Sequence, residues 1–227
     1  LRSMYQPYGE VDLSLDMEGL IKSTVPLAVK VIVPFWFSSA PYFNNDKEVQ
    51  QAALRHIRNY CQAALRHPQA MPKGLFEACV EHFTQSLWRL SYSGGNMKEE
   101  ISAFGDFLHG FMKLFYPRWH EYKFKSRSKR KKLRIGYISS NFRNQAVSFY
   151  MANRILHADK TRFETFIFSL ERRCDEMTER IKETCDRYIA ITDFKDVDAM
   201  AQTLADSQMD VLIYTDIGMD PLTYKLA

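Results

Sequence analysis

The chain has 227 residues, of which 46% are apolar and 26% are charged. These proportions are typical of a globular protein with a sizeable core, and they exclude collagen, a coiled coil and disorder over the whole length. The formal net charge is +4, but eight basic residues and no acidic one lie in the segment from Lys123 to Arg134. The rest of the chain holds 23 basic and 27 acidic residues, so the charge total does not indicate a nucleic-acid-binding protein.

The cysteine content and the apolar runs of the sequence indicate the cellular compartment of the protein. Four cysteines without a C-x-x-C pair are too few for a disulfide scaffold, so we expect reduced thiols and a cytoplasmic protein. No secretory signal is visible, and the chain starts at Leu1, so we expect further sequence upstream. The most apolar stretch, Val25 to Phe43, is interrupted by prolines and a lysine, which favours a buried core or interface segment over a membrane span.

The first half of the chain reads as an all-α domain, residues 1–122. Apolar residues recur at helical spacing in three stretches, and a proline or a pair of glycines ends each stretch. The predicted helices cover residues 45–67, 72–90 and 96–116. The apolar faces of this domain are candidates for contact with a partner chain or with a second copy of the protein.

The pattern changes after a basic segment, residues 123–132. Because aromatic stacking residues do not continue through this segment, its composition favours a solvated linker over nucleic-acid attachment. Strand-like runs then alternate with helical ones, which predicts βαβ units and a parallel sheet. Residues 133–227 are therefore expected to form a Rossmann-like α/β half, truncated soon after its fourth strand. The predicted strands are Leu133–Ser139, Phe163–Ser169, Arg187–Ile191 and Val211–Thr215, and the predicted helices are Val147–His157, Asp175–Cys185 and Asp196–Ser207.

Two loops of this half are candidate binding sites, because ligands of open parallel sheets bind outside the carboxyl ends of the strands. One loop, Ser139 to Gln145, is polar, contains an arginine and precedes a helix whose N-terminal amides favour anionic or polar ligands. The other loop is Asp216 to Pro221. The same residue types also serve as ordinary caps and turns. The candidate substrate-binding residues are Ser139, Ser140, Arg143, Asn144, Asp216, Gly218 and Met219.

Several familiar signatures are absent from the sequence. Neither G-x-G-x-x-G after a strand nor a P-loop motif occurs, so a dinucleotide dehydrogenase and a P-loop enzyme are not supported. The six histidines show no i, i+4 pair and no cysteine at metal-ligand spacing, so we expect no metal site. Asp196 and Asp198 have an acid spacing that some metal-dependent transferases use, but their place at a predicted helix start favours capping.

Short runs across the second half match a known family in order and spacing. They are Leu133–Ser140, Phe142–Asn144, Arg162–Glu164, Cys185–Arg187 and Val211–Pro221. Through these runs residues 132–227 resemble the start of the catalytic region of SPINDLY-type O-linked N-acetylglucosamine transferases. The helical half resembles, by its position, the module that precedes this region in bacterial members.

The resemblance implies the first half of a GT-B glycosyltransferase, in which a second Rossmann half supplies most of the donor site. It implies inverting transfer of a sugar from UDP-N-acetylglucosamine to Ser or Thr of a protein or peptide, without a metal or other cofactor. The expected partners are thus the UDP-sugar and the acceptor, with no membrane and no nucleic acid.

Gln145 stands where the family has a histidine, in a run that elsewhere reads Phe-Arg-Asn-His. A neutral imidazole can accept a proton near pH 7, whereas an amide cannot. The amide can still hydrogen-bond a sugar hydroxyl or a phosphate, so Gln145 remains the candidate at the catalytic position. This departure leaves an alternative open: a catalytically inactive protein-interaction module on the same scaffold.

Overall fold

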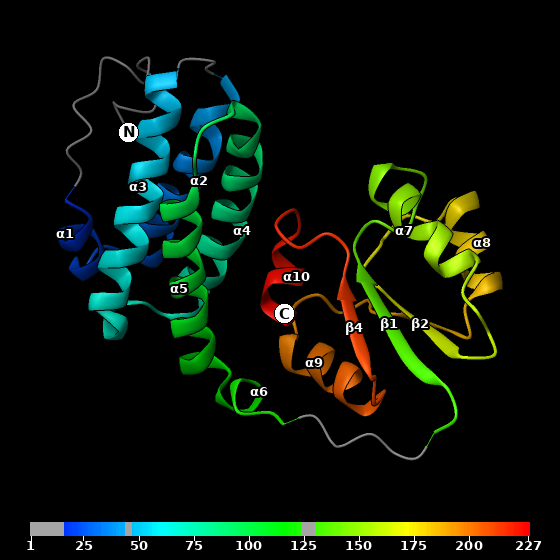
Figure 1. The fold of residues 1–227 in the computed structure, drawn as a ribbon. Coiled ribbons are helices and arrows are strands. Elements are labelled where there is room, and N and C mark those ends of the chain that lie inside the picture. Colours follow the sequence, from blue (N-terminus) through cyan, green and yellow to red (C-terminus); the bar gives the residue numbers. More distant parts are fainter. Residues whose placement is uncertain (1–15, 44–46, 124–129) are drawn as a thin grey trace. The chain divides into compact units, whose positions relative to one another are not determined.

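The computed structural model describes residues 16–43, 47–123 and 130–227 (Figure 1). The chain divides into two compact units, residues 1–120 and 121–227. The start of the first predicted helix, at residues 45–46, and most of the basic segment lie outside the described residues. Within the described ranges, no helix has both the length and the apolar character needed to cross a membrane.

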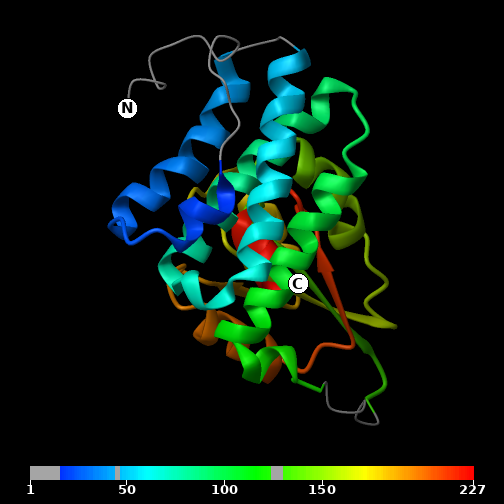
Figure 2. The ribbon, with the colours of Figure 1, turned by 90° about the vertical axis from the view of Figure 1, so that its left-hand side faces the viewer.

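The first unit is helical, and its helices pack side by side, with α2 against α4 and α3 against α5 (Figures 1 and 2). The three predicted helices are confirmed as α3, α4 and α5. Prolines follow the ends of two helices: Pro68 starts a short 3-10 turn after α3, and Pro117 starts α6 after α5. The helices are α1 (Met17–Lys22), α2 (Leu27–Phe43), α3 (Lys47–Arg66), α4 (Lys73–Leu90), α5 (Lys98–Phe115) and α6 (Pro117–His120).

Aromatic rings form the core of the helical unit. Phe76 of α4 is fully buried, and its ring centroid lies 5.5 Å from that of Phe107 and 5.7 Å from that of Phe111, both in α5. Rings at such separations contribute stabilisation beyond the burial of their area. Ile101, on the apolar stripe that the sequence predicts for α5, is 49% exposed and lies outside this core.

Helix α2 differs from the sequence expectation, which gives no helix at Leu27–Phe43. It contains the buried Pro34, which lacks the N–H for a helical hydrogen bond and typically costs about 3 kcal/mol in a helix interior. Its packing against α4 and α3 offsets that cost. Of the two expectations for this segment, a buried core or an interface, the buried core is wrong for five apolar side chains, which are 39–51% exposed: Val25, Leu27, Val29, Ile32 and Phe35.

The second unit is a parallel four-stranded sheet in the order β3-β2-β1-β4, with helices on both faces (Figure 1). Helices α7 and α8 pack together on one face, and α9 and α10 contact each other on the opposite face. The Rossmann-like fold expected from the alternating pattern is therefore confirmed. The elements are β1 (Leu133–Ser139), α7 (Ala146–Leu156), β2 (Phe163–Ser169), α8 (Glu176–Thr184), β3 (Arg187–Ala190), α9 (Val197–Asp206), β4 (Val211–Tyr214) and α10 (Pro221–Leu226).

Agreement with the predicted elements is close where the local pattern is strong. The first two strands have the predicted bounds, and the last two are each one residue shorter. The capping interpretation of Asp196 is confirmed, because its side chain accepts a hydrogen bond from the backbone N–H of Ala199 at 2.9 Å. Helix α10 is not predicted, although Asp220 at its N-cap and Pro221 at its first position are both helix-start signals.

The end of the basic segment is tied into the sheet unit by ion pairs. Arg130 Nη2 lies 3.2 Å from Asp210 Oδ1, and Arg134 Nε lies 2.8 Å from Glu164 Oε2. Carboxylates of the second unit therefore neutralise two of the eight basic charges between Lys123 and Arg134.

Candidate functional site

Asp216 joins the turn after β1 to the turn after β4. Its Oδ2 accepts hydrogen bonds from the hydroxyls of Ser139 (3.0 Å) and Ser140 (2.9 Å). The same oxygen accepts from the backbone N–H of Ser140 (2.9 Å) and from Nδ2 of Asn141 (2.8 Å). Because β1 and β4 are parallel neighbours, their carboxyl ends meet at one edge of the sheet. The two candidate loops therefore form one continuous surface.

Two members of this network lie beneath that surface. Ser139 and Asp216 are both fully buried, so a ligand at the sheet edge does not reach them directly. They hold the two turns together, whereas Ser140 is partly exposed and lines a pocket at this edge of the sheet. The other oxygen of Asp216, Oδ1, is buried and has no hydrogen-bond partner among the described residues.

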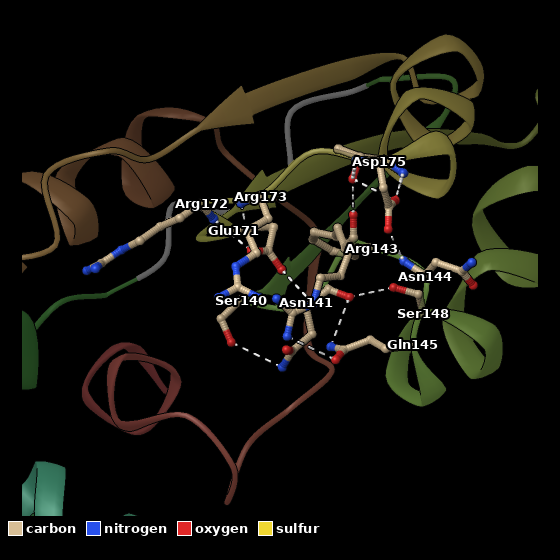
Figure 3. A network of polar contacts seen from close by, with 12 residues as sticks. Ser140, Asn141, Arg143, Asn144, Gln145, Ser148, Glu171, Arg172, Arg173 and Asp175 are labelled. Atoms are coloured by element: carbon tan, nitrogen blue, oxygen red, sulfur yellow. Dashed lines mark hydrogen bonds and ion pairs between the residues drawn. The ribbon is translucent and has the colours of Figure 1, made fainter.

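Neighbouring elements fix the rest of the turn after β1 (Figure 3). Arg143 Nε lies 3.4 Å from Glu171 Oε2, in the turn after β2. The backbone N–H of Asn144 donates to Asp175 Oδ2 at 2.6 Å, and this hydrogen bond is the main cause that lowers the pKa of the Asp175 carboxyl. The loop is thus tied to the turn after β2 and to the start of α8.

Gln145 makes its hydrogen bonds within its own turn (Figure 3). Its Oε1 accepts from Arg143 Nη2 at 3.2 Å, and its Nε2 donates to the backbone oxygen of Asn141 at 3.4 Å. Gln145 holds the N-cap position of α7 without a side-chain cap. The amide therefore orients Arg143, and it brings no titratable group to the site.

A pocket of about 300 Å³ opens at this edge of the sheet, and we call it the strand-end pocket. Turns after all four strands line it, as the rule for parallel sheets predicts. Its lining comprises Ser140 and Arg143 after β1, Leu170 to Arg173 after β2, Phe194 after β3, and Asp220 and Leu222 in the turn and first residues after β4.

Three arginines dominate the charge of the strand-end pocket. Arg143 is paired with Glu171, whose Oε1 also accepts the backbone N–H groups of Arg172 and Arg173 at 2.9 Å each. The guanidinium of Arg172 lies 4.4 Å from the ring centroid of Phe194. Across the described residues, no carboxylate pairs with the guanidinium of Arg172 or Arg173. Since the planar guanidinium matches phosphate and carboxylate oxygens, the pocket favours an anionic ligand.

Asp220 lines the strand-end pocket, although it is not among the candidate residues predicted from the sequence. Its Oδ1 accepts from the backbone N–H of Leu222 at 2.8 Å and of Thr223 at 3.1 Å. Burial, chiefly, and the nearby Asp216 carboxylate raise the pKa of Asp220 above its ordinary value, against the lowering effect of these hydrogen bonds. Its position next to Pro221 in a polar turn is the sequence signal that marks it, but its burial is not readable from the sequence.

Gly218 and Met219 shape the turn after β4. Gly218 has a φ of +93°, in the region that favours glycine. The backbone N–H of Met219 donates to the backbone oxygen of Asp216 at 3.0 Å. These two candidates lie in the same turn as Asp216, but neither lines the strand-end pocket.

The described side chains form no metal-binding cluster. Among residues 16–43, 47–123 and 130–227, no three His, Cys, Asp or Glu side chains lie close enough together to hold a metal ion. The chemistry that the site can offer is therefore that of guanidinium, hydroxyl, amide and carboxyl groups.

Comparison with known proteins gives one family and a solved structure. Residues 110–219 match the model of Glycosyl transferase family 41, a range that includes β1 to β4 and every candidate site residue. No curated protein sequence matches the chain. A mutant O-GlcNAc transferase from Thermobaculum terrenum is 16% identical with a TM-score of 0.38, and the alignment covers 84% of this chain and 46% of that one. The chain therefore spans less than half the length of that transferase.

Proposed function

We propose that this chain is part of a glycosyltransferase that moves a sugar from a nucleotide-sugar donor to a protein. The observation that carries the proposal is the joined pair of turns at the carboxyl edge of the parallel sheet, tied by Asp216 beside an arginine-lined pocket. The match of residues 110–219 to Glycosyl transferase family 41 supports it, because the match includes the turn after β1 and the turn after β4 as far as Met219.

The resemblance to SPINDLY-type O-linked N-acetylglucosamine transferases supports a finer proposal. The donor is UDP-N-acetylglucosamine, the acceptor is a Ser or Thr hydroxyl of a cytoplasmic protein, and the anomeric carbon is inverted. The sheet unit is the first half of a GT-B enzyme, and its carboxyl edge forms one wall of the cleft that holds the activated sugar.

Each candidate residue has a role in this proposal. Arg143 and Ser140 contact the substrate from the pocket side. Asn144 and Gln145 hold the same turn in place, and Gln145 can hydrogen-bond a sugar hydroxyl. Asp216, with Ser139, Gly218 and Met219, shapes the floor beneath them.

The alternative, a catalytically inactive interaction module, is not favoured over the transferase, because the exposed apolar side chains of the segment Val25 to Phe35 bear on partner binding and not on catalysis. A surface of this kind can bind a partner chain or a second copy. It belongs to the helical unit, so it is compatible with a catalytic sheet unit.

The test uses the full protein that contains this chain, incubated with UDP-N-acetylglucosamine labelled in the sugar and with a Ser/Thr peptide library. We expect release of UDP and peptides heavier by one N-acetylhexosamine. Arg143→Ala should lower kcat/KM about 10- to 100-fold, as loss of a hydrogen bond to a charged group does. Arg180→Ala, on the exposed side of α8, is the matched control and should leave it unchanged. Folded protein that neither binds UDP nor transfers sugar to any peptide would contradict the proposal.

A further inference from the structure

Sugar transfer to a hydroxyl requires that the hydroxyl proton be removed, and the amide of Gln145 does not titrate. We propose that Asp220 is the catalytic base of the strand-end pocket. This inference rests on the proposed function and adds to it the group that takes the proton.

The position of Asp220 fits a fixed proton acceptor. It lines the strand-end pocket together with Ser140 and Arg143, at the edge where the parallel strands end. Both backbone hydrogen bonds to its side chain go to one oxygen, Oδ1, from Leu222 and Thr223. They hold the carboxylate in one orientation, so that Oδ2 keeps its capacity to accept a proton.

The other carboxylates near the pocket are already engaged. Glu171, which also lines the pocket, faces Arg143 with Oε2 and accepts two backbone N–H groups with Oε1. Asp216 is fully buried and bonded to four donors. Asp175 is held by the N–H of Asn144. Asp220 is therefore the pocket carboxylate that has no arginine or lysine partner within the described part of the chain.

The electrostatic surroundings of Asp220 support the same role. Burial and the Asp216 carboxylate raise its pKa, which brings the base closer to the working pH and makes it a stronger proton acceptor than an ordinary aspartate. The backbone hydrogen bonds from Thr223 and Leu222, and the nearby Ser140 hydroxyl, act in the opposite direction. The charged groups that line the pocket with Asp220 are Arg143 after β1 and Glu171, Arg172 and Arg173 after β2. Asp216 lies in the same turn, and Lys225 lies in the last turn of α10.

The step balances without a further reactant. A lone pair of the acceptor oxygen forms the bond to the anomeric carbon while the bond from that carbon to the diphosphate oxygen breaks. The electron pair of the broken bond leaves with the nucleoside diphosphate. The acceptor proton passes to Asp220 Oδ2 and from there to water.

The deciding variant is Asp220→Asn in the full protein, because Asn caps a helix as well as Asp does but cannot take up a proton. We expect kcat to fall about 10²- to 10⁴-fold, the usual contribution of a general base, with the KM for the UDP-sugar little changed. The acidic limb of the pH–rate profile, where the wild-type base becomes protonated, should disappear. Asp16→Asn makes the same chemical change at the N-cap of α1 and should alter neither quantity.

A second variant keeps the inference testable if Asp220→Asn folds poorly. Asp220→Gly leaves space at the same position, and glycine at an N-cap costs only a few tenths of a kcal/mol relative to Asp. Added formate should restore part of its rate, because a small carboxylate can occupy the place of the missing one.

The outcomes separate this inference from the proposed function. If the wild-type protein transfers sugar while Asp220→Asn keeps both its rate and its acidic limb, the role of Asp220 is refuted and the proposed function stands. If Asp220→Asn does not fold, absence of rescue of Asp220→Gly by formate likewise refutes the role. If the folded wild-type protein neither binds the UDP-sugar nor transfers sugar, the proposed function fails, and this inference fails with it.

Discussion

Asp216→Ala should destabilise the sheet unit strongly, because this buried side chain satisfies four donors. The hydroxyl of Ser140 and the amide of Asn141 are partly exposed and can turn to water. The buried hydroxyl of Ser139 and the fixed backbone N–H of Ser140 cannot do so easily. An unsatisfied buried donor costs about 1–3 kcal/mol, so we expect a loss of about 2–6 kcal/mol in the free energy of unfolding. That is a large part of the roughly 5–15 kcal/mol that stabilises a typical domain.

Hydrogen exchange read by mass spectrometry in increasing urea can assign this loss to the correct unit. Peptides from β1 and β4 should exchange faster in Asp216→Ala. Tryptophan fluorescence is an internal reference, because the three tryptophans of the chain, at positions 36, 88 and 119, lie in the helical unit. The midpoint of the fluorescence transition should remain at the urea concentration of the wild type.

A matched variant shows whether burial is the cause. Asp196 also caps a helix, but it is exposed and accepts from one backbone N–H, so Asp196→Ala should cost only about 0.5–2 kcal/mol. A loss for Asp216→Ala within about 0.5 kcal/mol of zero would refute the argument that Asp216 holds the two turns together.

Three further changes test the two cores and the acid stability. Phe76→Ala should lower the unfolding free energy of the helical unit by about 3–5 kcal/mol, because the ring is fully buried. Tyr92→Ala, at a residue that is 77% exposed, should lower it by less than about 0.5 kcal/mol. Urea unfolding followed by tryptophan fluorescence measures both changes, and equal effects would contradict the packing described. Gly136→Ala should cost about 1–3 kcal/mol, since a Cβ there would lie 2.8 Å from two neighbouring side chains; unchanged exchange rates in β1 would be evidence against this. Burial alone would raise the pKa of Asp186, but hydrogen bonds from a lysine and a threonine lower it overall. The stabilisation by Asp186 is therefore present above the pKa that this carboxyl has in the unfolded chain, and it is lost as the pH falls through its pKa in the folded protein. When urea midpoints are measured against pH, Asp186→Asn should reduce the loss of stability on the acid side.

The local sequence pattern is sufficient to predict most elements. Helices and strands follow from apolar spacing, since a period near 3.6 or 2 places apolar side chains on one face. β1 and β2 have their predicted bounds, and polar residues after apolar strands mark the turns after β1 and β4 as candidate binding loops. Helix α2 is missed because Pro34 lies within it, and only its packing against α4 and α3 outweighs that local penalty.

Taken alone, the sequence determined the alternation of strands and helices, and with it the edge of the sheet at which the candidate binding loops lie. The tertiary structure decided which side chains at that edge are available. Ser139 and Asp216, 77 residues apart, bond to each other below the surface, while Asp220 and Arg172 come from different turns to line the same pocket. Burial and partner choice depend on contacts between distant segments, which a local pattern does not encode, and these contacts set both the charge of the pocket and the pKa of its carboxylate.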